Sequence, residues 1–252
     1  MAMLARRGFH PASTRPDLPF PPDLNAEKAE QLSALLAHYA FRLFLRGAIL
    51  KPPGFAPAET TRYLKAQQAR KYAEMLVHLG LVRKLARGRY RCRWPARSFG
   101  GTLEWYVARE LRRRYAWDVV TGVKLHVSGA GGDFDVVAAA EGKLIYLELK
   151  SSPPKNLVPA EVGAFFDRLR VLRPDSALFV VDTALRLSDK ILPMLLEELE
   201  RRQGRAPDPP RQIGSQLWAL TPNLYTVNGR RDLMANIGRA IAHGLLARAP
   251  EF

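Results

Sequence analysis

Three charged side chains in the middle of the sequence could form one chemically active site: Asp135, Glu148 and Lys150. Glu148 and Lys150 are separated by one residue, so on a β-strand both project from the same face. The rest of that strand is apolar, and burying either charge alone is energetically unfavourable. Two carboxylates and an ammonium at one strand end would suit a metal ion that assists cleavage of a phosphodiester bond.

The surrounding segment predicts the elements that must position these side chains. In residues 143–150, the run between Lys143 and Glu148 is apolar, as expected for a buried strand. A Glu-Gly turn at 141–142 precedes it, and a hairpin around this turn would bring Asp135 beside Glu148. Asp133 is the alternative to Asp135, because it lies two residues earlier and therefore on the same strand face. We favour Asp135, since it leads directly into the apolar strand.

Each of these residue types has its own chemical role. Asp135 and Glu148 would supply hard oxygen ligands to Mg²⁺ or Mn²⁺, which lowers the pKa of a bound water and neutralises charge on the phosphate. Lys150 would orient or deprotonate that water and stabilise the developing charge. Glu104, in the first turn of a helix expected over 102–115, is a further candidate ligand, directly or through water. Its alternative role is a favourable interaction with the helix dipole.

The charge of the chain indicates a polyanionic partner. The 252 residues carry a formal net charge of +15, from 39 Lys and Arg against 24 Asp and Glu. Residues 1–95 contain 17 of the basic residues and 6 of the acidic ones, an excess of 11. Nucleic acid is the first expectation and an anionic membrane the second. The uneven distribution predicts that binding and chemistry belong to different domains.

Several classes of protein are not expected. The single Cys92 excludes an intramolecular disulfide and a cysteine-rich zinc site. No apolar run reaches transmembrane length, and no hydrophobic stretch follows the N-terminal basic residues. We therefore expect a cytoplasmic protein with no membrane partner. The phosphate-binding pattern GxxxxGK[ST] is missing from the sequence, so we expect no nucleotide cofactor.

The order of the candidate residues is that of a known superfamily. Glu104 is followed by Asp135-Val136-Val137-Ala138 and then by Glu148-Leu149-Lys150-Ser151. This pattern resembles the PD-(D/E)XK, or restriction-endonuclease-like, nucleases over roughly residues 100–182, and locally the archaeal Holliday junction resolvases. The resemblance implies an α/β fold with a mixed sheet flanked by helices, and a divalent metal that also binds the carbonyl of Leu149. A homodimer is expected as well, because one site cuts one strand.

The N-terminal part resembles a winged helix-turn-helix module. Helices are expected over 25–46, 59–65 and 67–79, and a β-hairpin over 81–93. The run EMLVHLGLVRKLARGRYR, residues 74–91, carries the resemblance. In that family the third helix enters the major groove and the wing lies on the backbone. The implied DNA-binding residues are Gln67, Gln68, Arg70 and Lys71 on the helix, with Arg83, Lys84, Arg87, Arg89 and Arg91 on the wing. The alternative role of such a module is dimerisation or protein docking.

The predicted organisation has three parts. Residues 1–24 are rich in proline and are expected to form a flexible arm, 25–95 a winged-helix DNA-binding domain, and 96–252 the nuclease domain. In the last part we expect strands at 117–126, 177–182, 216–220 and 224–227, and helices at 159–172, 189–202 and 231–248.

These expectations combine into one functional hypothesis with three alternatives. The hypothesis is a metal-dependent DNA endonuclease acting on duplex or branched DNA, in a process such as repair or recombination. The first alternative is structure-specific resolution of junctions. The second is a non-catalytic DNA-binding regulator or assembly subunit with a degenerate nuclease fold. The third is RNA as the substrate, which charge does not distinguish from DNA.

Overall fold

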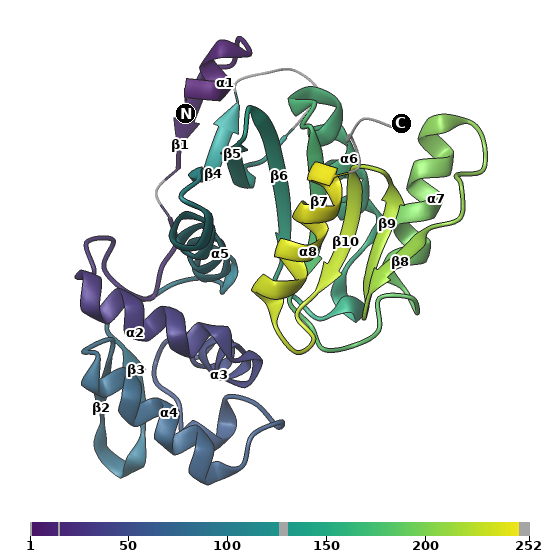
Figure 1. Ribbon diagram of the computed structural model, residues 1–252. Coiled ribbons are helices and arrows are strands. Elements are labelled where there is room, and N and C mark those ends of the chain that lie inside the picture. Colours follow the sequence, from purple (N-terminus) through teal and green to yellow (C-terminus); the bar gives the residue numbers. More distant parts are fainter. Residues whose placement is uncertain (1, 15, 126–130, 247–252) are drawn as a thin grey trace. The chain divides into compact units, whose positions relative to one another are not determined.

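The computed structural model describes residues 2–14, 16–125 and 131–246 (Figure 1). Its contacts divide the chain into two compact units. The helical unit is Arg15–Tyr106, and the sheet unit joins Met1–Thr14 to Val107–Phe252. These boundaries differ from the predicted ones at 24/25 and 95/96. Helix α5 (Gly100–Tyr115) runs from one unit into the other.

The sheet unit has an α/β fold built on one large mixed sheet. Among the described residues, the sheet has eight strands in the order β1-β4-β5-β6-β7-β10-β9-β8. The strands are β1 (Pro11–Ser13), β4 (Asp118–Leu125), β5 (Phe134–Ala140), β6 (Lys143–Lys150), β7 (Ser176–Val181), β8 (Arg211–Gly214), β9 (Leu217–Thr221) and β10 (Leu224–Asn228). β7 runs parallel to both β6 and β10, and the other neighbours are antiparallel.

Helices flank this sheet on both faces. They are α1 (Ala2–Arg6), α6 (Pro159–Leu172), α7 (Ile191–Gln203) and α8 (Leu233–Leu246), with a short 3₁₀ turn η3 (Pro154–Asn156). α6 and α7 cover one face of the sheet, and α8 lies on the opposite face (Figure 1). The centroid of the Phe165 ring on α6 lies 5.9 Å from that of the Tyr146 ring and 5.2 Å from that of the Phe179 ring. These aromatic contacts fix α6 on β6 and β7. The last two residues of the helix expected over 231–248 lie outside the described residues.

The predicted hairpin forms between β5 and β6. Glu141 and Gly142 have φ values of 50° and 74°, and positive φ at both central residues is what a tight two-residue reversal requires. The strands pair antiparallel with Val136 opposite Leu147. One residue further along this register, Asp135 lies opposite Glu148.

The prediction of a flexible arm over residues 1–24 is wrong for the described residues. Leu4 is buried in the core under α6 and α7, and β1 extends the sheet by pairing with β4. Arg7 Nη2 lies 2.7 Å from Asp175 Oδ2. Pro11 is tolerated because β1 is an edge strand, where a missing N–H is harmless. Further along, Phe20 is buried in the helical unit, with its ring 5.0 Å from that of Trp105.

The helical unit contains helices followed by a two-stranded hairpin. Its elements are α2 (Ala26–Ala37), α3 (Tyr39–Ile49), η1 (Pro57–Glu59), α4 (Ala66–His78), β2 (Val82–Lys84), η2 (Ala86–Gly88) and β3 (Tyr90–Cys92). The helix predicted over 59–65 is reduced to the 3₁₀ turn η1. Thr60 Oγ1 returns a hydrogen bond to the carbonyl of Pro57 at 2.8 Å, which competes with helix continuation.

The helix predicted over 25–46 is divided at His38, whose backbone is extended, with φ −85° and ψ 119°. The buried Arg42 explains the break, because its Nη1 donates to the carbonyls of Leu36 and Ala37 at 2.7 and 3.0 Å. These carbonyls end α2 and would otherwise lack partners. No single helix in the described part of the chain has the length and apolar composition to cross a membrane. α2 and α3 pass that test only as a pair bent by 107°.

Gly47 provides a test of how α3 packs. A Cβ added at Gly47 would lie 1.8 Å from the backbone oxygen of Thr60. We expect Gly47→Ala to lower the free energy of unfolding by about 1–3 kcal/mol, because the backbone would have to move apart. Denaturant unfolding followed by circular dichroism measures this. Gly163→Ala is the control, since the nearest atom to its Cβ would be Glu198 Oε1 at 3.8 Å. Equal stability of the two variants would contradict the close packing.

Candidate functional site

The adjoining ends of β5 and β6 bring the predicted residues of the sheet unit together. Asp135 Oδ2 accepts a hydrogen bond from the backbone N–H of Leu149 at 2.7 Å. Lys150 Nζ lies 3.0 Å from Glu148 Oε1. Asp135 shares its strand face with Val137, which belongs to the core under α6 and α7. Two carboxylates and one amine therefore meet on the α6 face of the sheet.

Glu148 is the most deeply buried member of the site, with its side chain 2% exposed. Arg168, on α6, forms a two-pronged contact with it: Nη2 lies 2.7 Å from Oε1 and Nε 3.1 Å from Oε2. The hydroxyl of Tyr146 donates to Oε2 as well. A buried carboxylate with two cations and a hydroxyl around it is well compensated. We call Asp135, Tyr146, Glu148, Lys150 and Arg168 the strand-end cluster.

Lys150 is held as an ammonium. Burial opposes its charge, but the carboxylates of Glu148, Glu161 and Asp135 outweigh burial and raise the pKa of Lys150. Glu161, on α6, lies 3.2 Å from its Nζ. In the same cluster, burial first and the negative charge of Glu148 second raise the pKa of Tyr146 well above its ordinary value. Both side chains are therefore hydrogen-bond donors at neutral pH.

The two remaining acidic candidates are Asp133 and Glu104. Asp133 precedes β5, is 37% exposed and lies 3.7 Å from Lys124 Nζ in a surface ion pair. Asp135, and not Asp133, makes the contact with β6. Glu104 lies on the stretch of α5 that belongs to the helical unit, and its role as a ligand stays a prediction.

The donor atoms of the strand-end cluster suit a hard divalent cation. Within the described ranges no group of three or more His, Cys, Asp or Glu side chains could hold a metal ion. Mg²⁺, however, usually keeps several waters and takes only one or two carboxylates. Asp135, Glu148 and the Leu149 carbonyl are of the right type for such an ion. Arg168 is the competing group, because its guanidinium contacts both oxygens of Glu148.

Sequence reasoning missed three members of this neighbourhood: Tyr146, Glu161 and Arg168. The pattern of α6 contains a usable indication. Glu161 and Arg168 are seven residues apart, so they lie on one helix stripe together with Phe165 and Leu172, both of which are buried. Charged residues on an apolar stripe of a helix that covers a sheet predict partners on that sheet.

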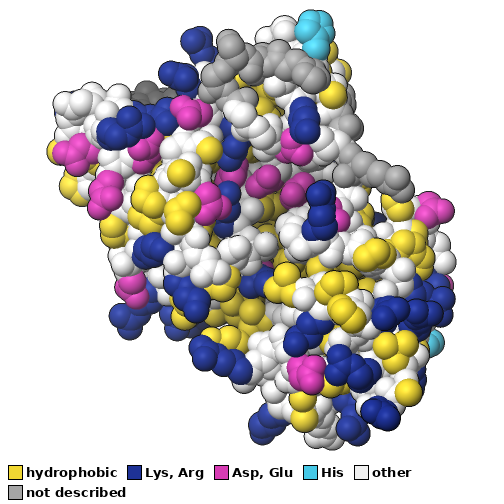
Figure 2. Space-filling view, turned by 180° about the vertical axis from the view of Figure 1, so that it is seen from behind, with side chains coloured by type: hydrophobic (Ala, Val, Ile, Leu, Met, Phe, Trp, Pro, Cys, Tyr) yellow, Lys and Arg dark blue, Asp and Glu magenta, His cyan; other side chains and the backbone are white. Residues whose placement is uncertain are grey.

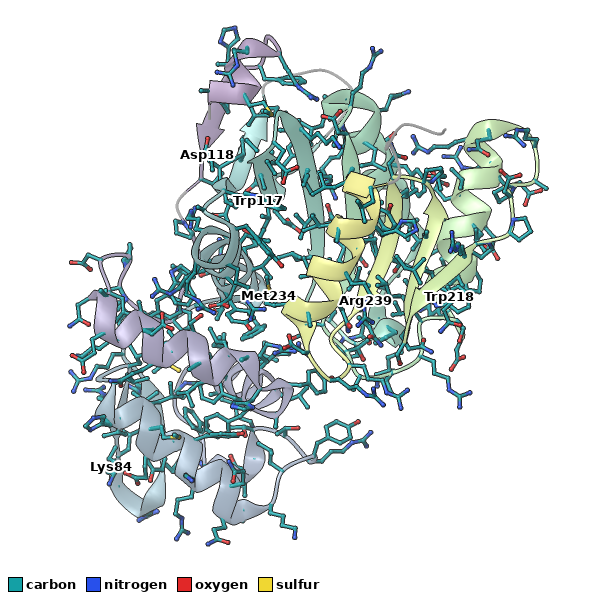
Figure 3. All side chains as sticks on the ribbon, in the orientation of Figure 1. Lys84, Trp117, Asp118, Trp218, Met234 and Arg239 are labelled. Carbon is teal, nitrogen blue, oxygen red and sulfur yellow. The ribbon has the colours of Figure 1, made fainter. Side chains whose placement is uncertain are left out.

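The side chains predicted for DNA binding fall into two groups. Gln67, Arg70 and Lys71 on α4 are exposed and Gln68 is half-buried, while Arg83 and Arg87 on the hairpin are exposed. Three others hold the hairpin in place. Lys84 (labelled in Figure 3) lies 2.8 Å from Glu74 on α4, and Arg89 and Arg91 donate to the carbonyls of Gly54 and Pro53.

The exposed face of the helical unit is basic. Lys and Arg side chains are plentiful over its visible face, at the lower right of Figure 2, and acidic side chains are sparse there. This agrees with the excess of positive charge in residues 1–95. Such a surface attracts polyanions.

No protein-family model and no curated protein matches the chain. Solved structures do match it. The protein VC1899 from Vibrio cholerae superposes with a TM-score of 0.52 at 16% identity, over 96% of this chain and 61% of that one. Can2 from Sulfobacillus thermosulfidooxidans, solved in complex with cyclic tetra-adenylate, gives a TM-score of 0.48 at 16% identity, over 95% and 59%. The likeness to VC1899 shows a shared fold, and this chain spans about three fifths of the length of these proteins.

Proposed function

We propose that the chain is a metal-dependent DNA endonuclease of the PD-(D/E)XK type. The observation that supports this proposal is the strand-end cluster, where Asp135, Glu148 and Lys150 converge from two paired strands. Their order along the sequence is that of the superfamily motif. Packing of the sheet core does not require a buried acid beside a half-buried amine, because apolar residues would pack there without desolvation of charge.

The protein groups of the site have separable roles in this proposal. Asp135, Glu148 and the Leu149 carbonyl would hold Mg²⁺ or Mn²⁺, and the ion, when bound, would supply an activated water and neutralise the phosphate. Lys150, whose Nζ lies 3.0 Å from Glu148 Oε1, would donate to the phosphate or orient the attacking water. Glu161 orients the Lys150 amine from α6.

DNA binding is assigned in this proposal to the helical unit, acting as a winged-helix module. α4 presents Gln67, Gln68, Arg70 and Lys71 to the groove, and the hairpin presents Arg83, Lys84, Arg87, Arg89 and Arg91 to the backbone. The separate basic unit accounts for targeting, and the strand-end cluster accounts for chemistry. Because one such site cuts one strand, a homodimer would serve duplex or junction cleavage.

A second candidate function has its own support. Arg168 contacts both oxygens of Glu148, and Glu148 is also bonded by Lys150 and Tyr146. A carboxylate with this many partners suits a structural ion cluster in a degenerate nuclease fold. The chain would then bind DNA as a regulator or assembly subunit. The two candidates differ in one property, which is cleavage that depends on a divalent metal.

Cleavage of a panel of labelled substrates tests both candidates. Linear duplex, four-way junction, single-stranded DNA and RNA are incubated with the full chain in Mg²⁺, in Mn²⁺ and in EDTA. We expect new DNA ends with either metal and none in EDTA, because the water needs the ion to become a nucleophile at neutral pH. Cleavage confined to the junction would assign junction resolution. DNA binding without new ends in Mn²⁺ would establish the non-catalytic alternative, and cleavage confined to RNA would replace the substrate.

A further inference from the structure

The base of the β2–β3 hairpin contains an open cavity of about 610 Å³. Three arginines and one tryptophan dominate its lining: Arg83, Arg91, Arg93 and Trp94, with Pro52, Cys92 and Pro95 completing it. All of these residues belong to the helical unit. We propose that this cavity binds one unpaired nucleotide of a single-stranded DNA segment, with the arginines on the phosphate and Trp94 stacked on the base.

The arrangement of the arginines is the first argument. Arg83 lies directly opposite Arg91 in the β2–β3 register, and Arg93 follows directly after the end of β3. Like charges opposite one another destabilise a strand pair. In the described part of the chain, no Asp or Glu oxygen lies within 4.0 Å of these three guanidinium groups. A bound phosphate would relieve this repulsion.

One of the arginines is held in a fixed position. Arg91 donates to the carbonyl of Pro53 from Nε at 2.9 Å and from Nη2 at 2.7 Å. The remaining donor, Nη1, has no acceptor among the described atoms. A guanidinium that is already positioned loses little conformational freedom when it binds a phosphate. The neighbouring Cys92 thiol does not oppose an anion, because burial raises its pKa to about 11 and keeps it neutral.

Trp94 is the second, independent argument. Its side chain is half-buried, and it pairs with no ring among the described residues. An indole that lines a basic cavity without an aromatic partner provides a stacking platform for a base, and stacking does not depend on sequence. The bases of a duplex are stacked on one another, so only an unpaired nucleotide offers a free face. Cavities of this volume are of the size that holds small ligands.

This inference rests on the proposed function only in taking DNA as the polymer. It adds the substrate class, because a duplex-binding helix beside a single-strand pocket suits a branched or partly unwound DNA. The pocket does not require the strand-end cluster to be catalytic. Binding in EDTA, where no metal-dependent cleavage occurs, therefore tests the pocket separately from the nuclease proposal.

The test measures affinity by fluorescence anisotropy with the full chain in EDTA. The probes are a labelled thymidine oligonucleotide, a uridine RNA strand of the same length, a matching oligonucleotide made of abasic sites, and a duplex. We expect Trp94→Ala to weaken binding of the thymidine oligonucleotide about tenfold. Binding of the abasic strand and of the duplex should stay within about twofold, since neither offers a free base to stack. Trp94→Phe should restore most of the affinity, because its ring also stacks.

A double arginine variant tests the phosphate contacts of the cavity, and a third arginine outside the cavity provides the control. Arg83→Ala with Arg93→Ala should weaken the thymidine and abasic strands alike and reduce the salt dependence of binding, because fewer phosphates are neutralised. Arg62 is an exposed arginine of the same unit and does not line the cavity. Arg62→Ala should therefore change neither the affinity for these strands nor its salt dependence. Circular dichroism melts confirm folding of each variant. The inference would be overturned if Trp94→Ala lost equal affinity for the duplex and for the thymidine strand, or lost no affinity for either. Tighter binding of the uridine RNA strand than of the thymidine strand would also overturn it.

Discussion

Replacement of Glu148 by Gln is expected to reduce metal-dependent DNA cleavage by about 10³-fold or more, because a lost metal ligand removes several kcal/mol of transition-state stabilisation. Gln keeps the shape of the side chain and can still accept hydrogen bonds from Tyr146 and Arg168. DNA affinity should not change, since the basic residues assigned to binding lie in the helical unit. Single-turnover cleavage with saturating enzyme separates the two effects, and anisotropy in EDTA measures affinity.

Asp135 and Asp133 provide a matched pair for the same assay. They are two residues apart, but only Asp135 contacts the backbone of β6, while Asp133 forms a surface ion pair with Lys124. Asp135→Asn should therefore abolish cleavage as Glu148→Gln does, and Asp133→Asn should leave it within about threefold, since an exposed ion pair contributes little. This pair also covers the outcome in which Glu148→Gln fails to fold. Full cleavage by Asp135→Asn, or loss of cleavage in Asp133→Asn, would contradict the assignment of ligands.

The β5–β6 hairpin and α6 could be predicted from the sequence because local features specify them. Glu141 and Gly142 allow the tight turn, and the apolar residues of β6 indicate a buried strand. α6 occupies the predicted range 159–172, with Pro159 at its first helical position, where proline is favoured. In such segments the hydrophobic pattern and the turn residues agree, so no distant part of the chain is needed to recognise them.

The elements that sequence reasoning missed depend on contacts between distant residues. β1 forms because Pro11 pairs with Leu125, and no local pattern in a proline-rich segment predicts that pairing. The break between α2 and α3 depends on where the Arg42 guanidinium is buried. β8, in a segment not expected to be a strand, needs β9 as its template. The pattern of charges predicted that Glu148 has a function, but the contact with Arg168, twenty residues away, required the packing of α6 on the sheet.

Arg168→Ala is expected to lower the free energy of unfolding by about 3 kcal/mol, because removing one partner of a buried ion pair leaves the other incompletely compensated. Lys150 and Tyr146 remain beside Glu148 and limit the loss. Arg170→Ala is the matched control on the same helix. Its side chain is 67% exposed and lies 3.8 Å from Asp167, so its removal should change stability by no more than about 0.5 kcal/mol. Denaturant unfolding in EDTA measures both variants.

The response of the Arg168→Ala variant to metal distinguishes the two candidate functions. In the endonuclease, the guanidinium competes with the metal for Glu148, so removing it should increase the stabilisation that Mn²⁺ gives to the folded chain. Cleavage at limiting Mn²⁺ should rise for the same reason. In a degenerate fold, the guanidinium is a permanent part of an ion cluster, and Mn²⁺ should stabilise neither chain. If Arg168→Ala loses stability and is not stabilised by Mn²⁺, the result would support a structural role for Glu148. If Mn²⁺ gives additional stability to Arg168→Ala but not to Arg170→Ala, the result would identify the Arg168 guanidinium as the group that a metal must displace.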